Sequence, residues 1–124
     1  RSPPARSSQT LVELRSPDSS SMPYRALTIC LAAGLDGIQK KLQPPKPVIK
    51  EVDKMTAEEK EQFHISALPP TLGEAIAELE KDVFVRKVLG EEFVQRYLEA
   101  KKAEWKEYMP QVTDWEVDKY LYRI

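Results

Sequence analysis

The chain has 124 residues, 41% hydrophobic and 31% charged, and its formal net charge is −1, which predicts one soluble globular domain with a real core. This near-neutral balance gives no general attraction to nucleic acid or to an anionic membrane, so we expect neither partner. One cysteine excludes an intramolecular disulfide framework, and the longest apolar run is far shorter than the roughly 20 residues that span a bilayer.

The first segment is expected to form a strand over residues 10–15. It is rich in strand-forming residues and alternates, with Val12 and Leu14 on one face and Leu11, Glu13 and Arg15 on the other. A turn over residues 16–18, Ser-Pro-Asp, is predicted to end it.

The second segment is predicted to be a buried helix over residues 23–42. Pro23 suits the first helical position, and the residues after it are apolar on nearly every side. Gly34 and Gly37 lower the helix propensity, so we expect another backbone to approach there. Because the chain supplies little protein to surround this helix, the isolated chain is expected to self-associate.

A proline-rich linker is predicted over residues 43–55, and the helices of the second half follow it. Three of these helices are expected to begin with a capping box of the form T-x-x-E, at Thr56, Thr71 and Thr113. In this motif the hydroxyl and the carboxylate each accept a hydrogen bond from a backbone N–H group that would otherwise have no partner.

The expected helices cover residues 57–63, 72–89 with a break near Asp82, 91–109 and 114–124, and Gly90 is expected to stop the second of them. The elements together predict an α+β chain that is mainly α-helical, with one or two strands and about four to five helices.

Glu13 and Arg15 are the sharpest candidates for chemistry. Residues two apart on a strand project to the same face, so a carboxylate and a guanidinium would stand side by side. A carboxylate can bind a hard cation such as Mg²⁺, and a guanidinium can clamp a carboxylate or a phosphate. With Arg1 and Arg6 nearby in sequence, the pair is compatible with a metal–phosphate site and equally with an ion-paired, half-exposed strand face.

The other chemically versatile residues are expected to be structural. His64 is the single histidine, and Cys30 lies in the most apolar helix, where a thiol behaves as a small hydrophobe. The aromatic side chains of the tail either pack in the core or dock onto another subunit; they are Trp105, Tyr108, Trp115, Tyr120 and Tyr122.

Several motifs in order resemble the C-terminal catalytic region of bacterial type I glutamine synthetases, most closely the Gram-positive type I-alpha branch. They are Val12-Glu13-Leu14-Arg15-Ser16-Pro17-Asp18, Met22-Pro23-Tyr24, Ala33-Gly34-Leu35-Asp36-Gly37-Ile38 and Thr71-Leu72-Gly73-Glu74-Ala75. The resemblance extends through the closing helices to Trp115-Glu116 and covers essentially the whole chain.

The resemblance implies a cytoplasmic ligase that joins ammonia to glutamate through a γ-glutamyl phosphate, using ATP and Mg²⁺ or Mn²⁺. By the matching motifs, Glu13 is expected to be a metal ligand, and Arg15 and Arg1 are expected to be catalytic residues that contact substrate. Arg1 would also contact the phosphate of the nucleotide. The family assembles as a double-ring dodecamer, and Asp53 stands where regulated members carry an adenylylated tyrosine.

The resemblance also implies that residues 1–124 are a single C-terminal portion of a glutamine synthetase catalytic domain, with strands taken from the parent sheet. Its expected parts are a strand segment 1–22, the buried helix 23–42, the proline-rich linker 43–55 and the C-terminal helices 56–124. The other metal-binding carboxylates lie elsewhere in such enzymes, so this chain alone is expected to be inactive. The alternative is a non-enzymatic module, derived from a glutamine synthetase, that binds partners or assembles through its helices.

Overall fold

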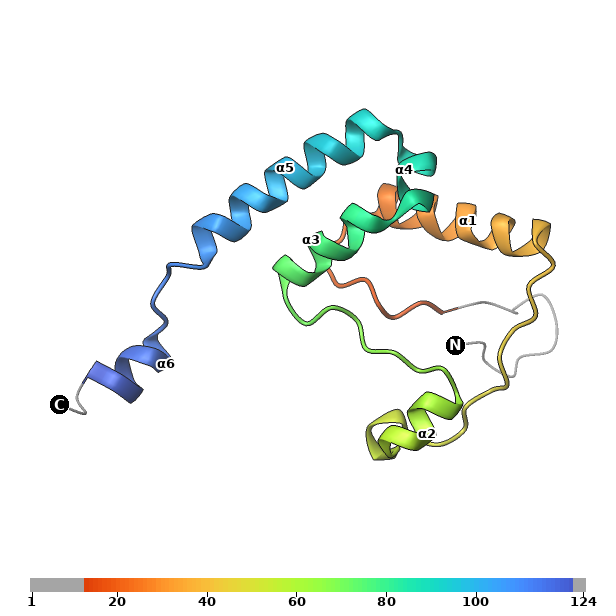
Figure 1. Cartoon of the computed structure of the whole chain (residues 1–124), viewed down its shortest axis with the longest axis horizontal. Coiled ribbons are helices and arrows are strands. Elements are labelled where there is room, and N and C mark those ends of the chain that lie inside the picture. Colours follow the sequence, from red (N-terminus) through yellow and green to blue (C-terminus); the bar gives the residue numbers. More distant parts are fainter. Residues whose placement is uncertain (1–12, 122–124) are drawn as a thin grey trace. The chain divides into compact units, whose positions relative to one another are not determined.

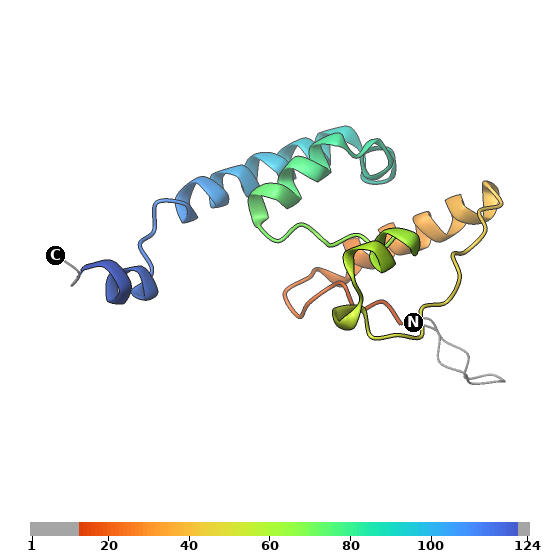
Figure 2. The same ribbon diagram turned by 60° about the horizontal axis from the view of Figure 1, so that its bottom comes forward.

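A computed structural model describes residues 13–121, which divide after Leu42 into two compact units (Figures 1 and 2). The first unit contains α1 (Pro23–Gln39). The second contains η1 (Val52–Lys54), α2 (Ala57–Gln62), α3 (Leu72–Lys81), α4 (Val83–Leu89), α5 (Glu91–Tyr108), α6 (Asp114–Glu116) and the π-helical turn η2 (Val117–Leu121). No helix in the described range is long and apolar enough to cross a membrane.

The expectation of a mainly helical chain is confirmed, whereas the expected strands are not seen between residues 13 and 121. Glu13, Leu14 and Arg15 have irregular backbone, and residues 10–12 lie outside the described range. A strand is stable only when a neighbouring strand completes its hydrogen bonds, and the described residues supply none.

The expected turn after this segment is centred slightly later than the sequence indicates. The N–H of Ser21 donates to the carbonyl oxygen of Asp18 at 3.2 Å. The N–H of Ser20 donates to Oδ1 of the same Asp18 at 2.9 Å. The hydroxyl of Ser20 also donates to Oδ1 at 2.7 Å, and this bond, followed by that from the Ser20 N–H, lowers the pKa of Asp18. The aspartate therefore organises the turn that leads into α1.

Helix α1 begins at Pro23 as expected, but the expectation that it is buried is wrong. None of its residues is buried, and Tyr24, Leu27 and Leu31 are 80%, 68% and 72% exposed. Apart from the neighbouring backbone of α1 itself, no described atom lies within 4 Å of where a Cβ would stand on Gly34 or Gly37, so the expected close approach of another backbone is also wrong for this structure. An apolar helix becomes buried only where other elements cover it, and within its own unit α1 is the only helix described.

The segment that opens the second unit is irregular as far as Lys50 and then forms η1 inside the expected linker. Met55, which follows η1, is 7% exposed. The capping box at α2 is confirmed: the N–H of Glu59 donates to the Thr56 hydroxyl at 3.2 Å, and the N–H of Thr56 donates to the Glu59 carboxylate at 2.8 Å.

The predicted break near Asp82 is confirmed, and it separates α3 from α4. Asp82 leaves the helical conformation at ψ 100°, and its carboxylate accepts a hydrogen bond from the N–H of Val85 at 2.9 Å. Gly90 ends α4 with φ +88°, a conformation that other residues rarely adopt. The chain then starts α5 directly, with its first two residues acidic as a helix N-terminus favours.

Helices α3 and α5 lie side by side in opposite directions, with α4 at the turn between them (Figures 1 and 2). Their shared core consists of Ile76, Val94 and Leu98, which are 7%, 1% and 2% exposed. The partly buried side chains around it are Leu72, Leu79, Val85, Leu89 and Trp105. Burial of such side chains supplies about 1.5–3 kcal/mol each, which makes this hairpin the packed part of the second unit.

The last helix begins at Thr113 with the expected capping box, in which the N–H of Thr113 donates to Glu116 at 2.8 Å. Trp115 and Tyr120 pack edge to face with ring centroids 6.0 Å apart, and the ammonium of Lys119 lies 4.3 Å from the Trp115 ring. Because Trp115 and Tyr120 are 60% and 56% exposed, the expectation of core packing is wrong for them, whereas Trp105 does pack against the core. Tyr122 lies outside the described residues.

Candidate functional site

Glu13 and Arg15 lie side by side although their backbone is not a strand. Nε of Arg15 donates to Oε1 of Glu13 at 2.5 Å. The Arg15 side chain is 66% exposed and the Glu13 side chain 38%. This hydrogen bond, followed by the carboxylate charge, raises the pKa of Arg15 above its ordinary value. Like any arginine, it is a cation over the physiological pH range.

The remaining predicted site residue, Arg1, lies outside the described residues, as does Arg6. The structure therefore brings Glu13 and Arg15 together and does not describe the position of either further arginine.

The described residues do not form a metal site on their own. Between residues 13 and 121 there is no group of three or more histidine, cysteine, aspartate or glutamate side chains that could hold an ion. Glu13 offers one carboxylate, and it is already paired with Arg15. Mg²⁺ requires near-octahedral oxygen coordination and a catalytic ion needs open positions as well, so one paired carboxylate does not fit such a group.

His64 has a structural position, as the sequence suggests. It follows α2 and has φ +54°. The N–H of His64 donates to the carbonyl oxygen of Glu61 at 3.0 Å, and the N–H of Ile65 donates to the carbonyl oxygen of Lys60 at 2.8 Å. These two hydrogen bonds are the Schellman arrangement that closes a helix. Cys30 is exposed on α1, so the expectation that it packs as a small hydrophobe is wrong.

Lys41 ends α1 in the same way as His64 ends α2. It has φ +51°, its N–H donates to Ile38 at 3.1 Å, and the N–H of Leu42 donates to Gly37 at 3.0 Å. Sequence reasoning missed both caps because a glycine or asparagine is the usual signal at this position.

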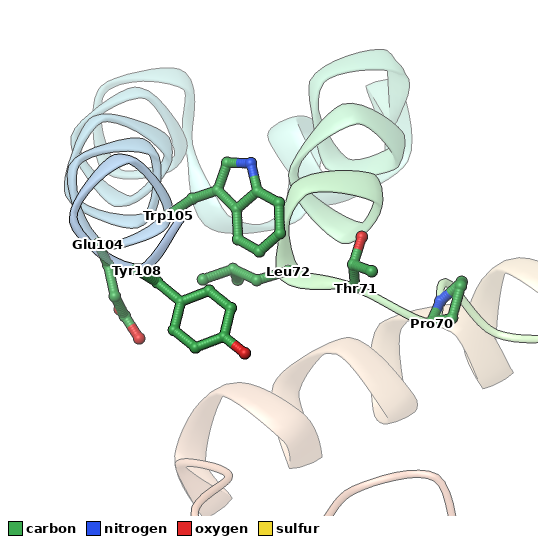
Figure 3. A pocket seen from close by; sticks show the side chains of 6 residues that line it. All are labelled: Pro70, Thr71, Leu72, Glu104, Trp105 and Tyr108. Carbon is green, nitrogen blue, oxygen red and sulfur yellow. The ribbon is translucent and has the colours of Figure 1, made fainter. Parts of the chain in front are cut away.

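A pocket of about 400 Å³ opens between the start of α3 and the end of α5 (Figure 3). Its lining residues are Pro70, Thr71, Leu72, Glu104, Trp105 and Tyr108. No local pattern predicts this pocket, because its two halves are more than thirty residues apart in the chain.

Gly73 allows the indole of Trp105 to pack at one side of this pocket. A Cβ at Gly73 would lie 2.7 Å from two atoms of that ring, which is well inside contact distance. The Trp105 ring in turn stacks on Tyr108, with centroids 5.7 Å apart.

Comparison with known proteins identifies the family of the chain. The family described as "Glutamine synthetase, catalytic domain" matches residues 1–120. The chain is 46% identical over 121 residues to a glutamine synthetase of Methanocaldococcus jannaschii, with 98% of this chain and 27% of the relative covered. It is 45% identical over 122 residues to that of Thermotoga maritima, with 98% and 28% covered.

A glutamine synthetase of Staphylococcus aureus is 39% identical over 121 residues, again with 98% of this chain and 27% of the relative covered. The chain thus spans just over a quarter of the length of these curated relatives. The family match, in contrast, takes in nearly every residue of this chain, including both residues of the Glu13–Arg15 pair. The chain belongs to the glutamine synthetase catalytic-domain family.

Proposed function

We propose that the chain is the C-terminal part of a glutamine synthetase catalytic domain, in an enzyme that joins ammonia to glutamate at the expense of ATP through a γ-glutamyl phosphate. The observation that carries this proposal is the family match over residues 1–120. The relatives that bear the name glutamine synthetase are consistent with it.

Glu13 and Arg15 are the residues of the described chain to which we assign roles in this reaction. Glu13 would supply one of several carboxylates to a divalent ion, Mg²⁺ or Mn²⁺, in the complete enzyme. Arg15 would bind substrate and the phosphoryl group in transfer, and a guanidinium remains a cation at any working pH. A fixed positive charge beside developing negative charge lowers the barrier to phosphoryl transfer.

Arg1 would contact substrate and the phosphate of ATP, on the strength of the sequence resemblance alone. The complete protein would be a cytoplasmic homo-oligomer, a dodecamer of two rings. Helix α6 and the turn that follows it would help to join the rings. The exposure of Trp115 supports an assembly role for this tail, because exposed aromatic side chains commonly anchor interfaces.

Substitution of Arg15 in the complete enzyme tests its role. Arg15→Lys keeps the charge but loses the planar pair of donors, so we expect kcat to fall by at least about a hundredfold. Arg96→Lys is the matched control, because Arg96 pairs with Glu92 on the exposed side of α5 and is expected to leave kcat unchanged. Equal activities of the two variants would rule out the assigned role.

Glu13→Gln in the complete enzyme tests the metal role separately. We expect weaker Mn²⁺ binding by calorimetry as well as lost activity, whereas Glu78→Gln, which removes a carboxylate from an exposed pair with Lys81, should change neither. The 124-residue chain alone is expected to show no Mn²⁺-dependent γ-glutamyl transfer. Such a signal from purified chain would contradict the proposal that further carboxylates are needed.

The second candidate is a non-enzymatic module that binds partners or assembles through its helices. The large apolar side chains exposed on α1, such as Tyr24, Leu27 and Leu31, favour it, since they offer surface for association. Titration of the full-length protein with Mn²⁺ and ATP separates the two candidates: an enzyme binds both ligands, and a non-enzymatic module need bind neither.

A further inference from the structure

The pocket between α3 and α5 has the chemical character of a proline-binding groove. Trp105 and Tyr108 stand one helical turn apart on α5 with their rings stacked at 27°, and Leu72 lies beside them (Figure 3). Tyr108 is 60% exposed, so its ring is available to a ligand. Glu104 stands at the rim and provides the one charged group among the lining residues.

Grooves lined by aromatic side chains bind extended proline-rich segments in many proteins. The flat apolar ring of proline packs on an aromatic face, and a polyproline II helix has already lost much of the conformational entropy that binding would cost. A carboxylate at the rim then selects segments that also carry a basic residue.

The chain itself contains a segment of this kind, Pro44-Pro45-Lys46-Pro47. Residues 43–49 have no helix or strand in the structure, and all are exposed. A polyproline II helix has three residues per turn, so Pro44 and Pro47 would lie on one edge of it with Lys46 beside them. Lys46 makes no ion pair within the described residues, and Lys50, farther along, pairs with Glu59.

The charges of the two surfaces are complementary. Oε2 of Glu104 accepts a hydrogen bond from the ammonium of Lys101 at 2.6 Å, and the Glu104 side chain is 57% exposed. A carboxylate can accept several hydrogen bonds, so Glu104 can bind a second cation without releasing the first.

We propose that this pocket binds the Pro44–Pro47 segment of a second copy of the chain, with Pro44 and Pro47 against the rings of Trp105 and Tyr108 and Lys46 on Glu104. None of residues 43–48 lines the pocket of its own chain in the described structure, so the contact is one between copies. The proposal does not depend on the enzymatic function proposed above.

A synthetic peptide of residues 43–50, titrated into the ¹⁵N-labelled full chain, tests the proposal. We expect the indole N–H signal of Trp105 to shift saturably while that of Trp115, which lies outside the pocket, stays in place. Tyr108→Ala should weaken binding about tenfold, because one aromatic wall is lost. Tyr120→Ala is the matched control and should leave the affinity unchanged.

A charge exchange tests the rim. Glu104→Lys should weaken binding about two- to fivefold, as expected for an exposed ion pair, and a peptide with Lys46→Glu should restore it. Circular dichroism of each variant shows whether the helices remain intact.

Three results would overturn the proposal. The first is that the 43–50 peptide causes no saturable shift of the Trp105 signal. This result counts against the proposal even where an unrelated polyproline peptide does bind. The second is an equal response to a peptide with Pro44→Ala and Pro47→Ala. The third concerns the chain that itself carries Pro44→Ala and Pro47→Ala. If these substitutions change the Trp105 signal by an amount that does not depend on chain concentration, the contact lies within one molecule.

Discussion

Single residues that end helices carry a cost which the surrounding hydrogen bonds offset. His64 and Lys41 both adopt a left-handed conformation, with φ of +54° and +51°, although neither is glycine. The left-handed region costs an ordinary residue roughly 1–2 kcal/mol, because its Cβ crowds the following carbonyl oxygen. The two hydrogen bonds of each cap offset this conformational cost.

Replacement of His64 by glycine should therefore stabilise the end of α2. We expect His64→Gly to raise the free energy of unfolding by up to about 1 kcal/mol, because the strain is removed while the cap remains, offset in part by the greater freedom of glycine in the unfolded chain. Chemical denaturation followed by circular dichroism measures the change. His64→Val should be destabilising, since a β-branched side chain tolerates this conformation poorly.

Gly73 acts through space and not through backbone freedom. Gly73→Ala would place a methyl group 2.7 Å from the Trp105 indole, and we expect the free energy of unfolding to fall by about 1–3 kcal/mol. Gly34→Ala is the control, because nothing lies within 4 Å of its added methyl and helix propensity favours alanine. Thermal unfolding of both variants decides the matter, and a Gly73→Ala chain as stable as the wild type would contradict the packing described for Trp105.

Among the helices and turns, the capping boxes link local structure to pH. The N–H and the hydroxyl of Thr113 both bond to the Glu116 carboxylate at 2.8 Å, and these bonds, the backbone one first, hold the pKa of Glu116 below its ordinary value. A depressed carboxyl pKa contributes stability that is present above the unfolded-state pKa and is lost as the pH falls through the folded-state pKa.

The N-terminus of α6 should accordingly fray in acid. We expect the amide signal of Thr113 to move, and its protection against hydrogen exchange relative to an unstructured amide at the same pH to fall, as the pH falls below about 4.5. In Glu116→Gln the amide oxygen still accepts the bond but does not titrate, so the change should disappear while the cap persists. A pH response of Thr113 that is the same in both proteins would show that another group is responsible.

For the whole molecule, apolar burial is unequally divided. The hairpin of α3 and α5 encloses the core of Ile76, Val94 and Leu98, whereas α1 buries none of its residues. The exposed face of α1 includes Tyr24, Leu27, Leu31, Leu35 and Ile38. A face of this kind favours association in water.

The purified chain should therefore self-associate, and α1 should be responsible. Leu31→Glu is expected to weaken association by at least about tenfold, because each buried leucine contributes about 1.5–3 kcal/mol. Gln39→Glu on the same helix introduces the same charge change without removing apolar surface, and it should leave association unchanged. Light scattering over a range of concentrations measures both, and a monomeric wild-type chain would contradict the prediction.

Local patterns in the sequence were sufficient for most of the helices. Pro23, the threonine caps, Asp82 and Gly90 act within a few residues of themselves, so the helix boundaries they predict agree with the structure. The proximity of Glu13 and Arg15 is also a local property, since side chains two residues apart meet even on irregular backbone. Membership of the glutamine synthetase family follows from the order of the motifs, and the comparison over residues 1–120 confirms it.

The features that depend on distant parts of the chain were decided only by the tertiary structure. Apolar periodicity shows that α1 has surface to bury but not whether anything covers it, and a strand at residues 10–15 requires a neighbour that no local pattern can supply. The pocket of Leu72, Trp105 and Tyr108 exists because Gly73 lets two helices that are far apart in sequence come together. Sequence determines what each residue prefers locally, and packing determines which of those preferences find a partner.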